Sequence, residues 1–205
     1  MAGKQQVRLY LASQSPRRAE LLQQVGIGFE RLSIDVAETL RENELPTDYV
    51  SRLAVSKAKA GWQQVVDQGL PILPVLGSDT SVVLANEIMG KPRDRHHGLD
   101  MLRRLSGNTH QVMSAVCLCM DDLQHVAINT TQVRFRKITE QELADYWQTG
   151  EPVDKAGGYG IQGKGAIFVD AINGSYSSVV GLPLAETWQL LLAIEQAGKQ
   201  IVDNV

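Results

Sequence analysis

The pattern of apolar and polar positions along the chain predicts both strands and helices. Short apolar segments at residues 8–12 and 72–76 are typical of buried strands. Apolar and polar residues alternate at 111–120 and 125–135, which predicts a long antiparallel pair. Apolar residues at helical spacing over 47–69 predict a long helix. The mixture favours an α/β protein with a sheet flanked by helices.

Capping and turn residues mark the ends of several elements. Ser15, followed by Pro16, and Thr47 are the expected N-caps of two helices. The dipeptide at 85–86, Ala-Asn, is expected to close a tight hairpin. Thr139 opens a Thr-x-x-Glu capping box. These local signals divide the chain into alternating elements without an internal repeat or a linker.

Length and charge narrow the class of protein. The chain has 205 residues, 43% of them hydrophobic, and we expect a single domain over 1–205. Its formal net charge of -3 provides no positive field for DNA, RNA or an acidic membrane surface, so we expect neither as a partner. No apolar segment approaches the length of a membrane span, and residues 1–6 are polar. We therefore expect a cytoplasmic protein.

Two cysteines, Cys117 and Cys119, are two residues apart in an alternating segment. Their side chains are expected on one face of a strand, where a disulfide between them would be strained. We expect two buried, reduced thiols and no zinc site of Cys and His ligands.

The turn before the first helix combines groups that bind phosphate. Ser13 supplies a hydroxyl, the expected helix N-terminus supplies backbone amides, and Arg17 and Arg18 supply guanidinium groups. This arrangement suits a triphosphate. The alternative is an ordinary capped helix with two surface arginines.

Other candidate residues come from the middle of the chain. Asp79 is expected at the carboxyl end of the strand at 72–76, where open α/β sheets form ligand crevices. A carboxylate there can hold a divalent ion or deprotonate water; otherwise it is a turn residue bonded to its own backbone. Lys57, near the apolar face of the long helix, and Lys91 are candidate cations, with solvated surface lysines as the alternative.

The segment 150–165 has six glycines in sixteen residues, which is unsuited to a helix or strand interior. Glycines allow backbone amides to approach a flat ligand, and Gln162 offers a donor and an acceptor to a base edge. The chain has neither a Walker motif nor a dinucleotide-binding glycine pattern after a strand.

Several motifs, in order along nearly the whole chain, resemble those of the Maf family of nucleoside-triphosphate pyrophosphatases. They are LASQSPRR at 11–18, GSDT at 77–80, GKP at 90–92, LSG at 105–107, DKAG at 154–157, YGIQG at 159–163 and VGLP at 180–183. The resemblance implies an elongated mixed sheet flanked by helices, related to the inosine-triphosphate pyrophosphatase fold, with two lobes around a central cleft. It also implies a homodimer and the reaction NTP + H2O → NMP + diphosphate.

The resemblance also implies roles for individual residues. The position matching Asp79 is the proton acceptor in the family. Positions matching Arg17, Thr80 and Gln162 separate the branch that acts on dTTP and UTP from the branch that acts on 7-methyl-GTP, which carries an aromatic and an acidic residue at the outer two positions. The trio in this sequence resembles the dTTP/UTP branch.

Combined with the residue chemistry, the resemblance predicts a mechanism. Ser13, Arg17, Arg18, Lys57 and Lys91 neutralise the triphosphate, while a divalent ion, Mg2+ or Mn2+, bridges phosphate oxygens. Asp79 orients or deprotonates the attacking water. An acidic residue often matches Ala37 in the family, and here Glu38 is the nearest carboxylate; Asp79 and Glu38 are the candidate metal ligands.

Two other functions compete with this interpretation. One is a pyrophosphatase for damaged or modified nucleotides, including modified pyrimidine nucleotides. The other is a nucleotide-sensing regulator of cell division, in which the cleft binds nucleotide without essential catalysis.

Overall fold

The computed structural model describes residues 7–202, so the polar segment 1–6 lies outside the described residues. The elements along the chain are β1 (Val7–Ala12), α1 (Pro16–Gln24), β2 (Gly28–Arg31), α2 (Pro46–Asp67), β3 (Val75–Leu84), β4 (Glu87–Met89), α3 (Arg95–Leu105), β5 (Thr109–Met120), β6 (Leu123–Phe135), α4 (Glu140–Gln148), β7 (Val169–Asn173), α5 (Tyr176–Val180) and α6 (Leu184–Val202). Three short 3-10 turns lie at Glu151–Asp154, Ala156–Gly158 and Lys164–Phe168.

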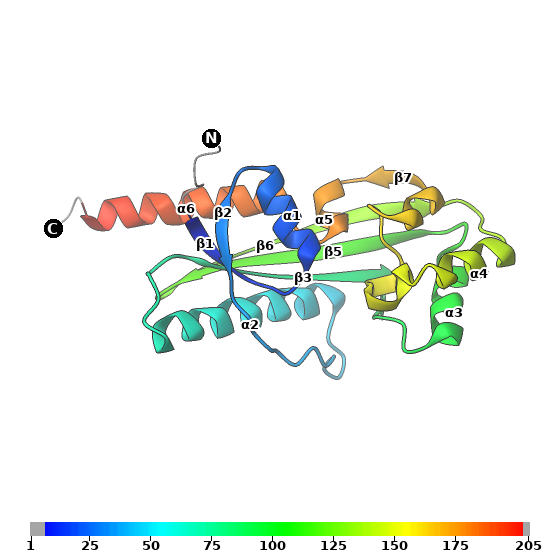
Figure 1. The fold of residues 1–205 in the computed structure, drawn as a ribbon, viewed down its shortest axis with the longest axis horizontal. Helices are drawn as coiled ribbons and strands as arrows, with labels where there is room; N and C mark the ends of the chain where they lie inside the picture. The colour runs from blue at the N-terminus through cyan, green and yellow to red at the C-terminus, as the bar shows by residue number, and fades with distance from the viewer. Residues whose placement is uncertain (1–6, 203–205) are drawn as a thin grey trace.

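The strands form one seven-stranded mixed sheet in the order β2-β1-β3-β5-β6-β7, with β4 paired to β3. Strand β1 is parallel to β2 and β3, and the other pairs are antiparallel. Helix α2 covers one face of the sheet, while α1 and α6 cover the opposite face (Figure 1). The elongated α/β fold class predicted from the sequence is confirmed.

Alternation along the central strands explains how both faces are covered. On β5, Val116 and Leu118 pack with α1 and α6, whereas Cys117 and Cys119 pack with α2. Both cysteines are buried and free, as predicted. Successive side chains of a strand point to opposite faces, so these long apolar strands hold helices on both sides.

Gly77 allows α2 to lie unusually close to β3. A Cβ atom on Gly77 would lie 2.3 Å from the carbonyl oxygen of Ala54 and 2.5 Å from the amide nitrogen of Ala58. Any larger residue would push the helix backbone away from the strand. The close approach places the middle of α2, which carries Lys57, beside the residues that follow Gly77.

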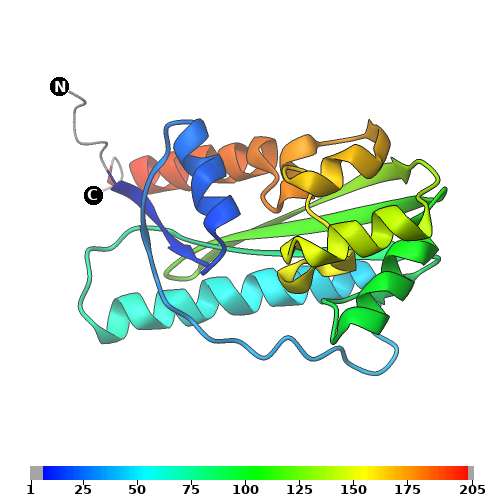
Figure 2. The ribbon, with the colours of Figure 1, turned by 45° about the vertical axis from the view of Figure 1, so that its right-hand side comes forward.

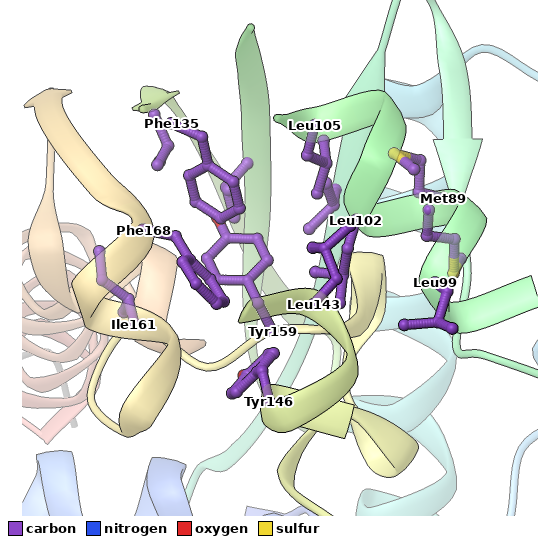
Figure 3. Packing of buried hydrophobic residues seen from close by; sticks show 14 residues of the cluster. Met89, Leu99, Leu102, Leu105, Phe135, Leu143, Tyr146, Tyr159, Ile161 and Phe168 are labelled. Atoms are coloured by element: carbon purple, nitrogen blue, oxygen red, sulfur yellow. The ribbon is translucent and has the colours of Figure 1, made fainter. Parts of the chain in front are cut away.

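The apolar core between the sheet and helices α1, α2 and α6 fills one end of the molecule. A second apolar core, the distal core, lies at the other end, where α3, α4 and the glycine-rich segment pack on β5 and β6 (Figure 3). Its centre is a group of aromatic rings. The ring centroids of Phe135 and Tyr159 are 4.7 Å apart, and those of Tyr146 and Phe168 are 5.0 Å apart, both in edge-to-face arrangement. The two cores share β5 and β6 and form the two lobes.

Most local predictions are confirmed. Ala85 and Asn86 adopt positive φ angles between β3 and β4, and Thr139 forms the expected capping box with Glu142. The long helix begins at Pro46 with Leu45 as its N-cap, so the assignment of Thr47 as cap is wrong. Proline favours the first helical position because it needs no donor there.

The expected strand at 72–76 requires a larger correction. Strand β3 begins at Val75, directly after Pro74, and continues to Leu84 because it pairs with β5 as far as Val83. Asp79 therefore lies inside a strand rather than at its end. It lies beyond the end of β1, whose last paired residue is Ala12, opposite Gly77.

Two further differences concern capping and a short helix. Ser15 occupies the N-cap position of α1, but its side chain makes no capping bond; instead its amide donates to Oγ of Ser13 at 3.2 Å. Helix α5, from Tyr176 to Val180, has no counterpart among the predicted elements.

Within residues 7–202, no helix is long and apolar enough to cross a membrane.

Candidate active site

A cleft of about 590 Å³ lies between the turn before α1 and the glycine-rich segment, whose positions can be followed in Figure 2. Every residue that the sequence singled out for the site lines this cleft. These residues are Ser13, Arg17, Arg18, Glu38, Lys57, Asp79, Thr80, Lys91 and Gln162. They come from distant parts of the chain, so the fold brings together what the sequence presents separately.

Two carboxylates and one ammonium group form the floor of the cleft. The Nζ atom of Lys57 donates to Oδ1 of Asp79 at 2.7 Å and to Oε1 of Glu38 at 2.5 Å. Asp79 and Lys57 are buried, whereas the side chain of Glu38 is half-exposed. One cation therefore holds two acidic groups close together at the edge of the solvent.

The surroundings separate the acidities of the two carboxylates. Burial raises the pKa of Asp79 above its ordinary value, although Lys57 and Arg18 act in the opposite direction. Burial also acts to raise the pKa of Glu38, but the hydrogen bond and charge of Lys57, together with the charges of Lys91 and Arg18, outweigh it and lower that pKa. Asp79 is thus the stronger base of the pair, which suits a proton acceptor.

Glu38 belongs to a long loop, residues 32–45, that α2 holds in place. Tyr49 Oη donates to the carbonyl oxygen of Glu38 at 2.9 Å, and Arg52 Nη2 donates to that of Thr39 at 3.1 Å. Arg52 also forms an ion pair with Glu44. Three residues of α2, including Lys57, therefore fix the loop beside Asp79.

Two further cations line the cleft, Arg17 in the first turn of α1 and Lys91 in the segment after β4. Arg17 lies on the rim, and its Nη1 is 3.4 Å from Oδ2 of Asp154 on the opposite wall. Lys91 is exposed on the lining of the cleft. Both cations can turn toward an incoming polyanion without breaking a buried interaction.

Arg18 is built into the wall more firmly. It donates from Nε to the carbonyl oxygen of Gly181 at 2.9 Å and from Nη1 to Oγ of Ser13 at 3.0 Å, and Nη2 lies 3.5 Å from Oγ1 of Thr80. Thr80 Oγ1 is also 2.8 Å from Oγ of Ser114. Arg18 thus joins α1 to β3 and to the turn after α5, in addition to facing the cleft.

Gln162 lies on the opposite wall, in a turn closed by a hydrogen bond from Gly163 N to Gly160 O at 3.1 Å. Its side chain is exposed and has no hydrogen-bond partner among the residues that the structure describes. The amide is therefore available to a ligand.

Comparison with known proteins gives the family. The family model described as "Maf-like protein" matches residues 8–194 of the chain. The chain belongs to the Maf family. This agrees with the resemblance inferred from the motifs.

Curated relatives of this Maf chain bear the name dTTP/UTP pyrophosphatase. The protein from Saccharophagus degradans is 53% identical over 94% of this chain and 91% of its own length. The protein from Pseudoalteromonas translucida is 54% identical over 89% of this chain and 95% of its own. The protein from Escherichia coli O157:H7 is 52% identical over 89% of this chain and 91% of its own length. Among solved structures, the Staphylococcus aureus Ham1 protein aligns with a TM-score of 0.44 and 14% identity over 62% of this chain and 71% of that chain.

Several residues that shape the site of this Maf chain escaped the sequence analysis. Tyr49 and Arg52 are three residues apart on α2, the helix that carries Lys57, and that helical spacing was the available signal. Ser114 carried no signal of its own, because its partner Thr80 is 34 positions away in sequence. Asp154 stands in the DKAG motif, but its contact with Arg17, 137 positions away, could not be predicted from the motif.

The acidic residues of the Maf cleft fit a divalent cation that also binds phosphate. No group of three or more His, Cys, Asp or Glu within the described chain forms a metal cage. Asp79 and Glu38 each use one oxygen for Lys57, which leaves Oδ2 and Oε2 without a donor among residues 7–202. Mg2+ commonly takes one or two carboxylates together with substrate phosphates and water, and this donor set is of that kind.

Proposed function

We propose that this chain is a nucleoside-triphosphate pyrophosphatase that hydrolyses dTTP and UTP to the monophosphate and diphosphate. The observation that carries the proposal is the pair of carboxylates, Asp79 and Glu38, held by Lys57 in the same cleft as Arg17 and Arg18. Relatives of about half identity that bear this enzyme name support the choice of nucleotide.

In the proposed reaction, a water oxygen forms a bond to phosphorus and the bond between the monophosphate and the diphosphate breaks. The proton of the water passes to Asp79, whose raised pKa favours that transfer. Arg17 and Lys91 neutralise the charge of the triphosphate and of the departing diphosphate. Arg18 and Ser13 keep the turn before α1 in position for the phosphates.

Glu38, together with the free oxygen of Asp79, would hold a Mg2+ or Mn2+ ion. When bound, this ion supplies positive charge to the phosphate oxygens. Lys57 keeps Glu38 ionised and adjacent to Asp79, so that Glu38 would be a ligand of the ion alone, whereas Asp79 would be both a ligand and the proton acceptor.

Base recognition is proposed for Gln162. Thymine and uracil share an N3–H donor next to a carbonyl acceptor, and the Gln162 amide can pair with both. Cytosine lacks that N–H, and we expect it to be the poorer base. Arg17 and Thr80, which also line the cleft, complete the set of residues that select the nucleotide. We further propose that the space beside Gln162 is too small for a purine.

The test is a diphosphate-release screen over dTTP, UTP, CTP, modified pyrimidine triphosphates, ATP and GTP, with Mg2+, with Mn2+ and with a chelator. We expect dTTP and UTP to give the highest kcat/KM and the chelator to abolish turnover. Higher kcat/KM for modified pyrimidines would redirect the proposal to damaged nucleotides. Absence of diphosphate from every pyrimidine nucleotide would overturn it.

We also propose that the two cores act as one domain, since β5 and β6 run through both.

We further propose that the protein forms a homodimer and acts on the cytoplasmic nucleotide pool. Val126 and Ile128, both exposed on β6, are candidate interface residues. Light scattering of the wild-type protein and of Val126→Lys tests the dimer, which the substitution should dissociate if that face forms the interface.

A further inference from the structure

The turn that carries Gln162 is held from behind by Tyr146 and Glu151. Tyr146 lies on α4, and Glu151 begins the 3-10 turn that follows it. Neither residue lines the cleft. Their side chains instead contact the backbone of the segment 160–165, on which Gln162 is exposed.

The carboxylate of Glu151 accepts three hydrogen bonds. Tyr146 Oη donates to Oε1 at 2.7 Å, the amide of Gly165 donates to Oε1 at 3.1 Å, and the amide of Lys164 donates to Oε2 at 2.8 Å. Tyr146 Oη in turn accepts from the amide of Gly160 at 3.1 Å. The two side chains thus bind the backbone on both sides of Gln162.

The protonation states of Tyr146 and Glu151 agree with their roles as donor and acceptor in these hydrogen bonds. Burial and the neighbouring carboxylate raise the pKa of Tyr146, so its hydroxyl keeps the proton that it donates. Burial acts to raise the pKa of Glu151, but the hydrogen bonds from Lys164, Tyr146 and Gly165 outweigh it and lower that pKa. Glu151 is therefore ionised and accepts from every partner.

Glycines allow the close approach of the turn to the pair. A Cβ atom on Gly163 would lie 2.4 Å from Oε2 of Glu151, and one on Gly165 would lie 2.7 Å from Oη of Tyr146. The glycines of this segment therefore serve the approach of Tyr146 and Glu151 from behind, whereas the sequence suggested only an approach to the ligand in front.

Apolar packing holds only part of the turn. Tyr159 and Ile161 are buried in the same core cluster as Tyr146 and Phe168 (Figure 3). The next side chains, Gln162 and Lys164, are exposed, so packing does not fix their backbone. That part of the turn is held by the Glu151 carboxylate and by short-range turn hydrogen bonds.

We propose that Tyr146 and Glu151 are positioning residues for nucleotide selection, because they hold the 160–165 turn in the conformation that presents Gln162 to the base. This inference rests on the proposed function for the identity of the ligand. The positioning itself is a property of the free protein and is measurable without nucleotide.

Tyr146→Phe tests the proposal because it removes the hydroxyl and keeps the ring that packs on Phe168. Tyr10→Phe is the matched control, since it removes another buried tyrosine hydroxyl, bonded to the carbonyl oxygen of Pro71 far from the turn. Glu151→Gln is a second variant, whose amide places a donor against an existing backbone donor. The measurements are amide hydrogen exchange of peptides covering 158–166 and the ratio of kcat/KM for UTP to that for CTP.

We expect Tyr146→Phe and Glu151→Gln to speed exchange in 158–166 by about fivefold or more, as loss of a net hydrogen bond predicts. The UTP-to-CTP ratio should fall by a similar factor, mainly through a higher KM for UTP and with kcat changed less than about twofold. Tyr10→Phe should leave both quantities unchanged. A faster exchange with an unchanged ratio, or an unchanged exchange rate in both variants, would overturn the inference.

The wild-type protein separates this inference from the proposed function. If it releases no diphosphate from dTTP or UTP, the proposed function is wrong. The ratio is then taken between the two best triphosphates, and an unchanged ratio overturns the inference. If no triphosphate is hydrolysed, nucleotide selection by this turn is overturned as well, and the exchange rates decide only whether the pair holds it.

Discussion

The Nζ atom of Lys57 lies 2.7 Å from Oδ1 of Asp79, and both residues are more than nine-tenths buried. The close approach of α2 to β3 at Gly77 makes this contact possible. Removal of Lys57 would leave the Asp79 carboxylate without its hydrogen-bonded cation, which is costly in a buried site. The pair therefore links the packing of the sheet directly to the chemistry of the cleft.

Asp79→Asn should keep the fold and lower kcat by about 100-fold or more. The amide oxygen can still accept from Lys57, but the side chain can no longer take a proton from water. Asp122→Asn, in the exposed turn between β5 and β6, is the matched control and should be silent. Steady-state kinetics with dTTP and circular dichroism check both variants. Near-normal turnover in the folded Asp79→Asn protein would contradict the role of Asp79 as proton acceptor. A cell-division phenotype that persists with the Asp79→Asn protein would favour the nucleotide-sensing regulator.

Asp79 should titrate above the ordinary range of an aspartate, near 3.9, because burial raises its pKa. Since the folded protein then binds this proton at a higher pH than the unfolded chain, the Asp79 contribution to stability improves as pH falls through the folded pKa. Lys57→Met should move that pKa higher still, because the ammonium charge favours the carboxylate. Carbon NMR titration of the side chain in the free protein checks both shifts, with Asp79→Asn for assignment. A downward shift in the Lys57 variant would contradict the account.

The two adjacent arginines should respond differently to substitution. Arg17→Ala and Lys91→Ala should each weaken triphosphate binding and turnover by about 1.5–3 kcal/mol, with little change in Tm, because both side chains lie on the accessible lining of the cleft. Arg18→Ala should in addition lower Tm by about 4 °C or more, because it removes the contacts to Gly181 and Ser13. Calorimetry and dTTP kinetics on the three variants test this. Equal Tm values for the Arg17 and Arg18 variants would show that Arg18 is not a structural link.

Gln162→Glu should change nucleotide preference more than catalysis. The ionised side chain offers only acceptors, which oppose a pyrimidine carbonyl, so kcat/KM for dTTP and UTP should fall by about tenfold or more while some purine turnover appears. Gln132→Glu, exposed on β6, introduces the same charge away from the cleft and controls for electrostatics. Kinetics over dTTP, UTP, CTP and GTP decide the matter. A single common factor for all four nucleotides would mean that Gln162 only shapes the turn.

Local features of the fold were predictable because their causes lie within a few residues. The positive φ angles at Ala85 and Asn86 follow from the two-residue length of the hairpin loop, and the capping box at Thr139 depends on side chains that meet nearby backbone. The long antiparallel pair of β5 and β6 also follows from a strict alternation joined by a short turn. The location of Asp79 was misplaced because the length of β3 depends on β5, more than thirty residues later.

Motifs in the sequence identify which side chains of the candidate site are chemically suitable, and they include Ser13, Arg17, Asp79, Lys91 and Gln162. The partners of the site residues depend on how the chain folds. The contact of Lys57 with Asp79 spans 22 positions, and that of Arg18 with Gly181 spans 163. Turn and helix signals decay within a few residues, whereas burial, pKa shifts and the support of the Gln162 turn by Glu151 depend on which distant surfaces pack together.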